Sequence, residues 1–219
     1  MRHFIVLALA VSNVLSVMIL LECKKGTLDE AYEESSEPAD ADFVMITPFV
    51  NMSDMGPIRE AYSEDASAPW GFIHQGIDFF PITNLVPFQA VSSGIVQSID
   101  LWQLETTGNW QVNLLLKYNS TFSLSYAFEP MTGSPADGQT QANHIRVTEG
   151  QEVSQGDTLG LLLAAGNGAH VDFGLLMNDP DSGLLAVCPE PYFTQAARDS
   201  ILTLIQRAWS GAEMCYFAQ

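Results

Sequence analysis

The sequence predicts an all-β core, a compact antiparallel β-sandwich, with one amphipathic α-helix at its C-terminal end. Residues 43–187 consist mainly of short apolar runs broken by Gly, Pro, Asn and Asp, and NWQVNLLLKYN and FSLSYAFE alternate apolar and polar residues as half-buried strands do. Residues 188–219 differ, because one apolar stripe recurs there at helical spacing. The stripe consists of Phe193, Ala197, Ile201, Leu204, Ile205 and Ala208. We therefore expect this segment to form a helix that packs on the β-domain.

The first 25 residues are predicted to be a signal peptide or a membrane anchor. Residues 4–21 form an uncharged apolar run that would span about 27 Å as a helix, close to the thickness of a bilayer core. Cys23 follows this run and is a candidate for lipidation, as in a bacterial lipoprotein, although Glu22 is a poor fit before such a cysteine. A lipoprotein signal, an uncleaved anchor and a cleaved signal remain three alternatives. All three predict an exported protein, periplasmic or at the cell surface, and the first two tether it to the membrane.

Residues 26–42 are predicted to be an acidic, disordered tether. The stretch from Asp29 to Asp42 contains seven acidic residues and no basic one, and it has too little apolar area to order itself. The whole chain has 26 acidic and 8 basic residues, a formal net charge of -18. So few cations cannot neutralise a phosphate backbone, and this excludes nucleic acid as a partner.

Two cysteines of the folded part, Cys188 and Cys215, are candidates for a disulfide bond. An exported chain enters an oxidising compartment, where a pair of cysteines tends to close. The alternative is a pair of reduced, buried cysteines, since Cys also serves as a small hydrophobic residue.

Two short segments carry His and Asp at spacings that place both side chains on one side of an extended chain. In WGFIHQGIDFFP, His74 and Asp78 are four residues apart, and Gly76 between them permits close backbone approach. In GNGAHVDFGL, His170 and Asp172 are two residues apart and face the same way. Such pairs are half of a zinc site, or only polar pairs on the wet face of a strand.

The order of the segments resembles the lysostaphin- and LytM-type zinc metallopeptidases, which are endopeptidases that cut peptidoglycan cross-links. The matching segments cover residues 70–176 and are, in order, HQGIDFFP, VPFQAVSSGIV, SYAFEP, VTEGQEVSQGDTLGLL and GNGAHVDFGL. The fourth segment also resembles biotinyl and lipoyl carrier domains, but these need a lysine at a hairpin tip. Here the only lysine of the domain, Lys117, lies within a predicted strand, which excludes a carrier function.

The resemblance implies a role for five positions. His74 and Asp78 match the first two zinc ligands, and His170 matches a catalytic histidine that assists the metal-bound water. Asp172 stands where the family has its third ligand, a histidine. Phe128 stands where the family has another active-site histidine, so that position is degenerate. His144 matches no family ligand, and we expect it at a loop or strand edge.

Both replacements predict a site that catalyses peptide hydrolysis less efficiently. One His and two Asp ligands leave a Zn²⁺ site without net charge, which polarises bound water less. A phenyl ring at position 128 cannot donate a hydrogen bond to a developing oxyanion, a loss of about 10²–10³ in rate in other hydrolases. The resemblance thus implies an envelope-associated domain that acts on or binds peptidoglycan, or a cell-wall hydrolase, and is weak or inactive as a peptidase. An active zinc endopeptidase with a His-Asp-Asp site is the alternative, and a tethered structural domain without a wall ligand is a third.

Overall fold

The structure is a computed structural model that describes residues 37–218. The predicted signal or anchor, Cys23 and most of the predicted tether lie outside the described residues. Within the described range, none of the helices is both long and apolar enough to cross a membrane.

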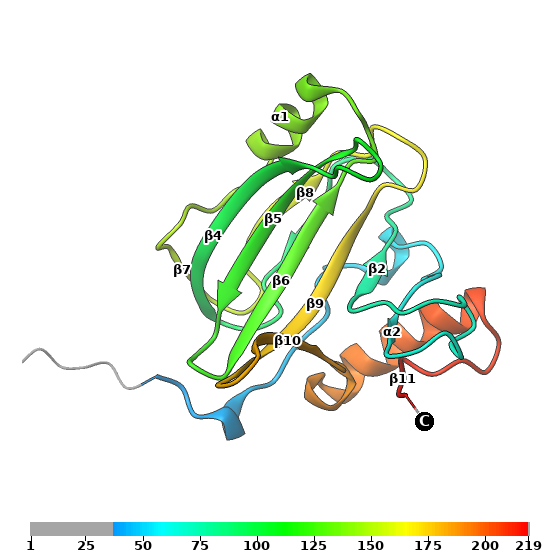
Figure 1. Cartoon of the computed structure of the whole chain (residues 1–219). Helices are drawn as coiled ribbons and strands as arrows, with labels where there is room; N and C mark the ends of the chain where they lie inside the picture. The colour runs from blue at the N-terminus through cyan, green and yellow to red at the C-terminus, as the bar shows by residue number, and fades with distance from the viewer. Residues whose placement is uncertain (1–36, 219) are drawn as a thin grey trace, which may run out of the picture. The chain divides into compact units, whose positions relative to one another are not determined.

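An antiparallel sheet forms most of the domain (Figure 1). The strands follow the order β10-β9-β6-β5-β4-β7, and β2 pairs with the part of the β9 edge that β10 leaves free. Their bounds are β2 (Ile77–Phe79), β4 (Gly94–Gln103), β5 (Trp110–Lys117), β6 (Phe122–Glu129), β7 (Glu152–Val153), β9 (His170–Asp179) and β10 (Gly183–Val187). Alternation along β5 buries one face of the sheet, as the sequence pattern predicts, whereas β6 is buried on both faces over most of its length.

Two further strand pairs complete the β-structure. The antiparallel pair β3 (Val86–Gln89) and β8 (Thr158–Leu162) lies against the buried face of the sheet, where the ring of Phe88 packs 5.9 Å from that of Phe128. The parallel pair β1 (Tyr62–Ser63) and β11 (Cys215–Tyr216) joins the start of the domain to its end. The all-β core predicted from the sequence is confirmed.

The predicted C-terminal helix is α2 (Gln195–Ala208), and its apolar stripe is buried. Thr194 caps its first turn, because the Thr194 hydroxyl accepts a hydrogen bond from the N–H of Ala197. The helix also fixes the chain that leads to β1. The carbonyl of Leu204 accepts from the N–H of Ile58, and the indole of Trp209 donates to the carbonyl of Arg59.

A second helix, α1 (Pro135–Asn143), was not predicted, because TGSPADG has the composition of a turn. Its start has the features of a helix N-terminus: Ser134 accepts from the N–H of Asp137, and Pro135 occupies the first turn. Gly138 lies so close to Trp110 that a Cβ there would approach the Trp110 Cβ to 2.7 Å. This helix has no buried apolar stripe, and its close contact with β5 therefore holds it in place. The remaining helical turns are η1 (Asp40–Asp42), η2 (Met52–Asp54) and η3 (Glu190–Tyr192).

The folded part includes residues 37–42, which the sequence analysis assigned to the tether. Glu37 pairs with Lys117 at 2.9 Å and accepts from the N–H of Ser120, while Asp40 accepts from the side chains of Asn119 and Thr121. The turn between β5 and β6 thus offers donors that match these acidic residues. Charge pairing thus holds residues 37–42 against the domain, although burial alone would not, and the domain boundary expected at Phe43 stays a prediction.

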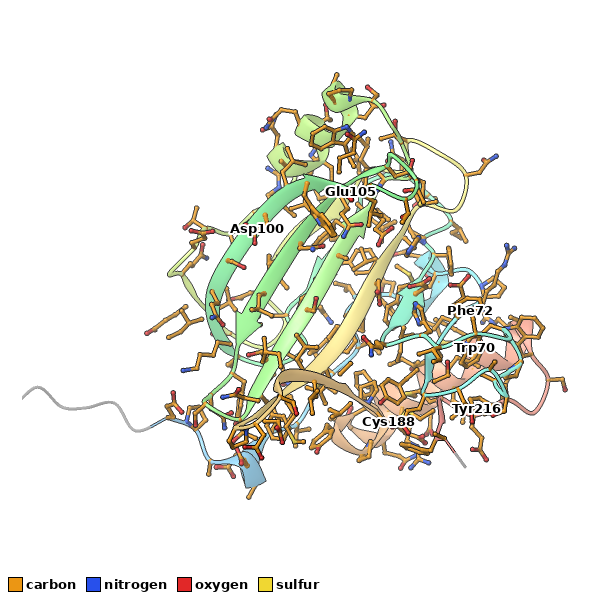
Figure 2. All side chains as sticks on the ribbon, viewed as in Figure 1. Trp70, Phe72, Asp100, Glu105, Cys188 and Tyr216 are labelled. Carbon is orange, nitrogen blue, oxygen red and sulfur yellow. A yellow bond between two sulfur atoms is a disulfide. The ribbon has the colours of Figure 1, made fainter. Side chains whose placement is uncertain are left out.

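A disulfide bond joins Cys188 to Cys215, with Cα atoms 5.9 Å apart. It links the segment after β10 to β11, and therefore holds β11 beside β1. Near this bond the indole of Trp70 lies edge-on to Tyr216, with ring centroids 5.3 Å apart (Figure 2).

Candidate metal centre

The pairing of β2, β9 and β6 brings the predicted site residues together. Asp78 of β2 lies directly opposite Asp172 of β9, and His170 of β9 lies opposite Glu129 of β6. These side chains line a cleft of about 430 Å³. Its walls are formed by Arg59, Glu60, His74, Asp78, Phe80, Glu129, Met131, Gly168, His170 and Asp172.

Ser63 of β1 positions the backbone of His74. The two residues exchange backbone hydrogen bonds, and the Ser63 hydroxyl also accepts from the N–H of His74 at 3.0 Å. The same hydroxyl donates to the carbonyl of Phe72 and accepts from the indole of Trp70. Since Ser63 is fully buried, this network fixes the loop that carries His74 against β1.

Both predicted histidines direct Nε2 toward Asp78. Nδ1 of His74 lies 3.0 Å from the carbonyl of Gly76, and Nδ1 of His170 lies 2.7 Å from the carbonyl of Gly168. A carbonyl only accepts, so each Nδ1 carries a proton, and each Nε2 can offer a lone pair to a metal once its own proton is released. The Nε2 atoms lie 3.4 Å and 3.6 Å from Oδ1 and Oδ2 of Asp78, respectively.

Asp172 lies beside this pair, and Gly76 makes room for it. A Cβ at position 76 would collide with Oδ1 of Asp172 and approach the carbonyl of Phe173 to 2.9 Å. Position 76 therefore requires glycine, in agreement with the close approach that its place in the motif predicts. Oδ1 of Asp172 is buried without a hydrogen-bond partner, and so is Oδ1 of Asp78.

Glu60 also lines the cleft, and its sequence context does not reveal this. Its carbonyl accepts from the N–H of Asp78 at 3.1 Å, which draws the two residues together. Ligand atoms of Glu60, His74 and Asp78 all lie within 4.8 Å of one another. Nothing in GPIREAYS signals this role, because α2 and β2 position the segment only in the folded chain. Within residues 37–218, a second compact group consists of Cys188, Glu190 and Cys215, but it is not a metal site because its cysteines are bonded to each other.

Phe128 does not face the cleft, in contrast to the expectation from the motif. Its side chain is fully buried in the core against Phe88, because alternate residues of β6 point to opposite faces. Its neighbour Glu129 lines the cleft instead, with Oε2 at 3.7 Å from Nε2 of His170. The residue of β6 that faces the site is thus a carboxylate. The alternation of side chains along the predicted strand would have indicated it. His144 follows α1 and does not line the cleft.

The crowding of carboxylates and imidazoles perturbs their pKa values. Burial lowers the pKa of His74, but the adjacent carboxylate of Asp78 outweighs it and raises the pKa to about 9. Burial, assisted by the charge of Asp78, raises the pKa of Asp172 to about 6. Burial also raises the pKa of Glu60 and of Glu129. Without a metal ion, bound protons therefore neutralise part of the negative charge of the cleft.

The residues present fit a divalent metal ion. Zn²⁺ binds His nitrogen and carboxylate oxygen at about 2.0–2.2 Å in tetrahedral geometry, which places neighbouring ligand atoms roughly 3.4 Å apart. The separation between His74 and Asp78 is 3.4 Å. The buried Oδ1 of Asp78, which has no hydrogen-bond partner, also requires a cation or a proton. Glu60, His74 and Asp78 would hold such an ion, and Asp172 lies next to them.

No protein-family model matches the sequence, and no curated protein matches it. Solved structures with a similar fold include a zinc containing peptidase from Vibrio cholerae, with 18% identity and a TM-score of 0.43, covering 65% of this chain and 39% of that one. Lysostaphin from Staphylococcus simulans has 17% identity and a TM-score of 0.42, with 76% and 56% coverage. The catalytic domain of a mutant of the prophage-encoded M23 protein EnpA from Enterococcus faecalis has 18% identity and a TM-score of 0.44, with 64% and 93% coverage.

This chain spans less than two thirds of the length of the first two of these structures. At such identities and TM-scores the similarities carry no conclusion about activity, ligands or partners.

Proposed function

We propose that this chain is an exported, membrane-tethered domain of the LytM type that binds a divalent cation and engages peptidoglycan peptides in the cleft. The observation that carries the proposal is the position of Asp78: its buried carboxylate lies between two imidazoles whose Nε2 atoms both face it. Metal-binding histidines commonly donate their other ring N–H to a backbone carbonyl, as both histidines here do. The order of the motifs in the sequence supports the choice of peptidoglycan.

Glu60, His74 and Asp78 would hold Zn²⁺, which supplies a Lewis acid for a peptide carbonyl or for water. His170 and Glu129 stand on the adjoining wall, where both can hold or accept a proton. Among the described residues that line the cleft, Arg59 is the one Lys or Arg, and we infer that its guanidinium binds a carboxylate of an acidic peptide.

Hydrolysis should be slow. Every carboxylate close to the cation reduces its effective charge, so it polarises water less than a site with more imidazole ligands. A domain that binds the wall, or another cell-wall hydrolase, with little turnover is therefore the preferred form of the proposal. An active endopeptidase is the second candidate, and the observation that favours it is Glu129, a proton acceptor where the motif comparison had suggested only a phenyl ring.

The test uses purified full-length chain with Zn²⁺ and insoluble peptidoglycan. The expected result is zinc-dependent co-sedimentation with slow release of peptide fragments, detected by mass spectrometry. Asp78→Asn should lose both, whereas Asp100→Asn, an exposed aspartate on β4, should keep both. Absence of binding and of cleavage by folded, zinc-loaded protein would overturn the proposal. Rapid cleavage would favour the active endopeptidase.

A further inference from the structure

A second pocket adjoins the cleft of the candidate metal centre. It has a volume of about 340 Å³, and we call it the side pocket. Arg59, Phe80 and Gly168 line both the cleft and the side pocket, so the two adjoin at these residues. The ring of Phe80 lies 5.2 Å from the ring of His170, whose Nε2 faces Asp78. A ligand that lies over this junction would therefore reach both the metal centre and the side pocket.

The two pockets differ in charge. Four carboxylates line the cleft, those of Glu60, Asp78, Glu129 and Asp172. Among the described residues, no acidic side chain lines the side pocket, and Arg59 is its one charged residue. In a chain with 26 acidic and 8 basic residues, such a pocket is a local site of attraction for an anion. The cleft suits a cation, and the side pocket suits a negatively charged group.

The guanidinium of Arg59 is available to a ligand. Within residues 37–218 it takes part in no ion pair, although carboxylates line the cleft beside it. Its backbone is held in place, because its carbonyl accepts from the indole of Trp209 at 2.9 Å and the N–H of Ile58 donates to the carbonyl of Leu204. An exposed guanidinium on a fixed backbone can pair with a carboxylate without first breaking an internal ion pair.

The rest of the side pocket is lined mainly by small and apolar groups. Three glycines and two alanines leave much of its wall without long side chains. Pro57, Pro81 and Ile82 supply apolar surface, and Ile82 is 64% exposed. Asn167 is the one neutral polar side chain among the described residues of this wall. Such a wall can bury methyl or methylene groups of a ligand, so it suits a short aliphatic stem.

We propose that the side pocket is a subsite for a peptide residue with a carboxylate on a short aliphatic stem, and that Arg59 binds this carboxylate. The carboxylate is either the free C-terminus of a peptide with a small last side chain or the side chain of an acidic residue. Both present two oxygens to the fork of a guanidinium. The inference rests on the proposed function, because the remainder of the peptide would lie in the cleft. It makes Arg59 and the side pocket determinants of specificity.

The test measures peptide binding to the full-length, zinc-loaded chain by isothermal titration calorimetry. The probes are N-acetyl-trialanine with a free C-terminus, its C-terminal amide, and two such amides in which the middle alanine is replaced by glutamate or by glutamine. At least one of the two acidic probes should bind about tenfold more tightly than its neutral counterpart, as expected for charge-assisted hydrogen bonds. The acidic probe that does so identifies the source of the carboxylate.

Two pairs of variants assign the effect to the side pocket. Arg59→Gln should abolish the preference for the acidic probe, whereas Arg146→Gln, at an exposed arginine that lines neither pocket, should retain it. Ala164→Leu, which fills the side pocket, should weaken binding of the acidic probe. Ala165→Leu changes the next exposed alanine, which does not line the pocket, and should leave binding unchanged. Zinc affinity should not fall in any of the four, because none of them removes a metal ligand.

The possible results separate the subsite from the proposed function. Equal binding of acidic and neutral probes, or an unchanged preference in Arg59→Gln, would overturn the subsite and leave the proposed function standing. Failure of all four probes to bind a chain that sediments with peptidoglycan would do the same. Equal weakening by Ala164→Leu and Ala165→Leu would overturn the placement in the side pocket, and loss of zinc from Arg59→Gln would overturn the role of Arg59 as a carboxylate receptor. Folded, zinc-loaded protein that binds neither the probes nor peptidoglycan would overturn both proposals.

Discussion

Asp172 links the stability of the metal-free domain to pH. Burial, followed by the charge of Asp78, raises its pKa from 3.8 to about 6. Because the pKa is higher in the folded state, the stabilisation from this group is fully present below pH 3.8 and is lost as the pH rises through about 6. We therefore predict that Asp172→Asn raises the melting temperature of chelator-treated protein at pH 7.5 and changes it little near pH 4.

The matched control for this prediction is Asp100→Asn. Figure 2 shows Asp100 on β4, at the other side of the view from Trp70 and Phe72. The Asp100 side chain is exposed, so the same chemical change should have little effect at either pH. Equal stabilisation by both variants, or stabilisation by Asp172→Asn at pH 4 as well, would refute the electrostatic explanation.

Phe128 and Glu129 allow the orientation of β6 to be tested. Phe128→His places a polar ring in the core and should lower the free energy of unfolding by at least about 1–3 kcal/mol. It should leave the zinc affinity of the folded protein unchanged. Glu129→His should cost less stability but change zinc affinity, because this side chain lines the cleft. Urea denaturation and zinc titration of both variants measure the two effects, and the reverse pattern would show that residue 128 faces the site.

The candidate site shows which residues the sequence could reveal. His74, Asp78, His170 and Asp172 were found because their spacing within extended segments fixes their direction. Glu129 was missed because the motif was compared letter by letter, although the period of β6 places residue 129, not 128, on the face of His170. Glu60 was beyond reach, since only the packing of α2 and the pairing with Asp78 bring it to the cleft.

At the level of elements, the disulfide supports the site through two short strands. It holds β11 beside β1, and Ser63 of β1 holds the backbone of His74. The double variant Cys188→Ser, Cys215→Ser opens a 28-residue loop, for which chain entropy gives a loss of about 3–4 kcal/mol in the free energy of unfolding.

We expect the same variant to bind zinc more weakly than its stability loss alone explains, because the His74 loop loses its support. Chemical denaturation gives the first quantity and zinc titration of the folded fraction gives the second. Unchanged unfolding free energy together with unchanged zinc affinity would show that β11 stays beside β1 without the bond.

The two helices differ in how far their sequences predict them. The helix α2 carries an apolar stripe that must be buried, and this stripe was visible before the structure. The helix α1 is short and largely polar, and its formation depends on Ser134 as a cap and on the contact of Gly138 with Trp110. Such tertiary contacts leave little trace in a local sequence pattern.

For the molecule as a whole, we predict that a chain beginning at Glu37 folds independently. A chain that begins at Phe43 should also fold, but it loses the contacts of Glu37 and Asp40 with the turn between β5 and β6. Near-UV circular dichroism and thermal melting should show native packing in both and a lower melting temperature in the shorter one. Equal melting temperatures would show that residues 37–42 contribute nothing.

Metal binding at Asp78 is the claim on which the account of the cleft depends. Its most direct test is diffraction from zinc-soaked crystals of the protein, recorded on both sides of the zinc absorption edge. The account predicts an anomalous peak at about 2.0–2.2 Å from Nε2 of His74 and from a carboxylate oxygen of Asp78. A fully soaked crystal with no peak in the cleft, or with its only peak at a site such as His144, would contradict it.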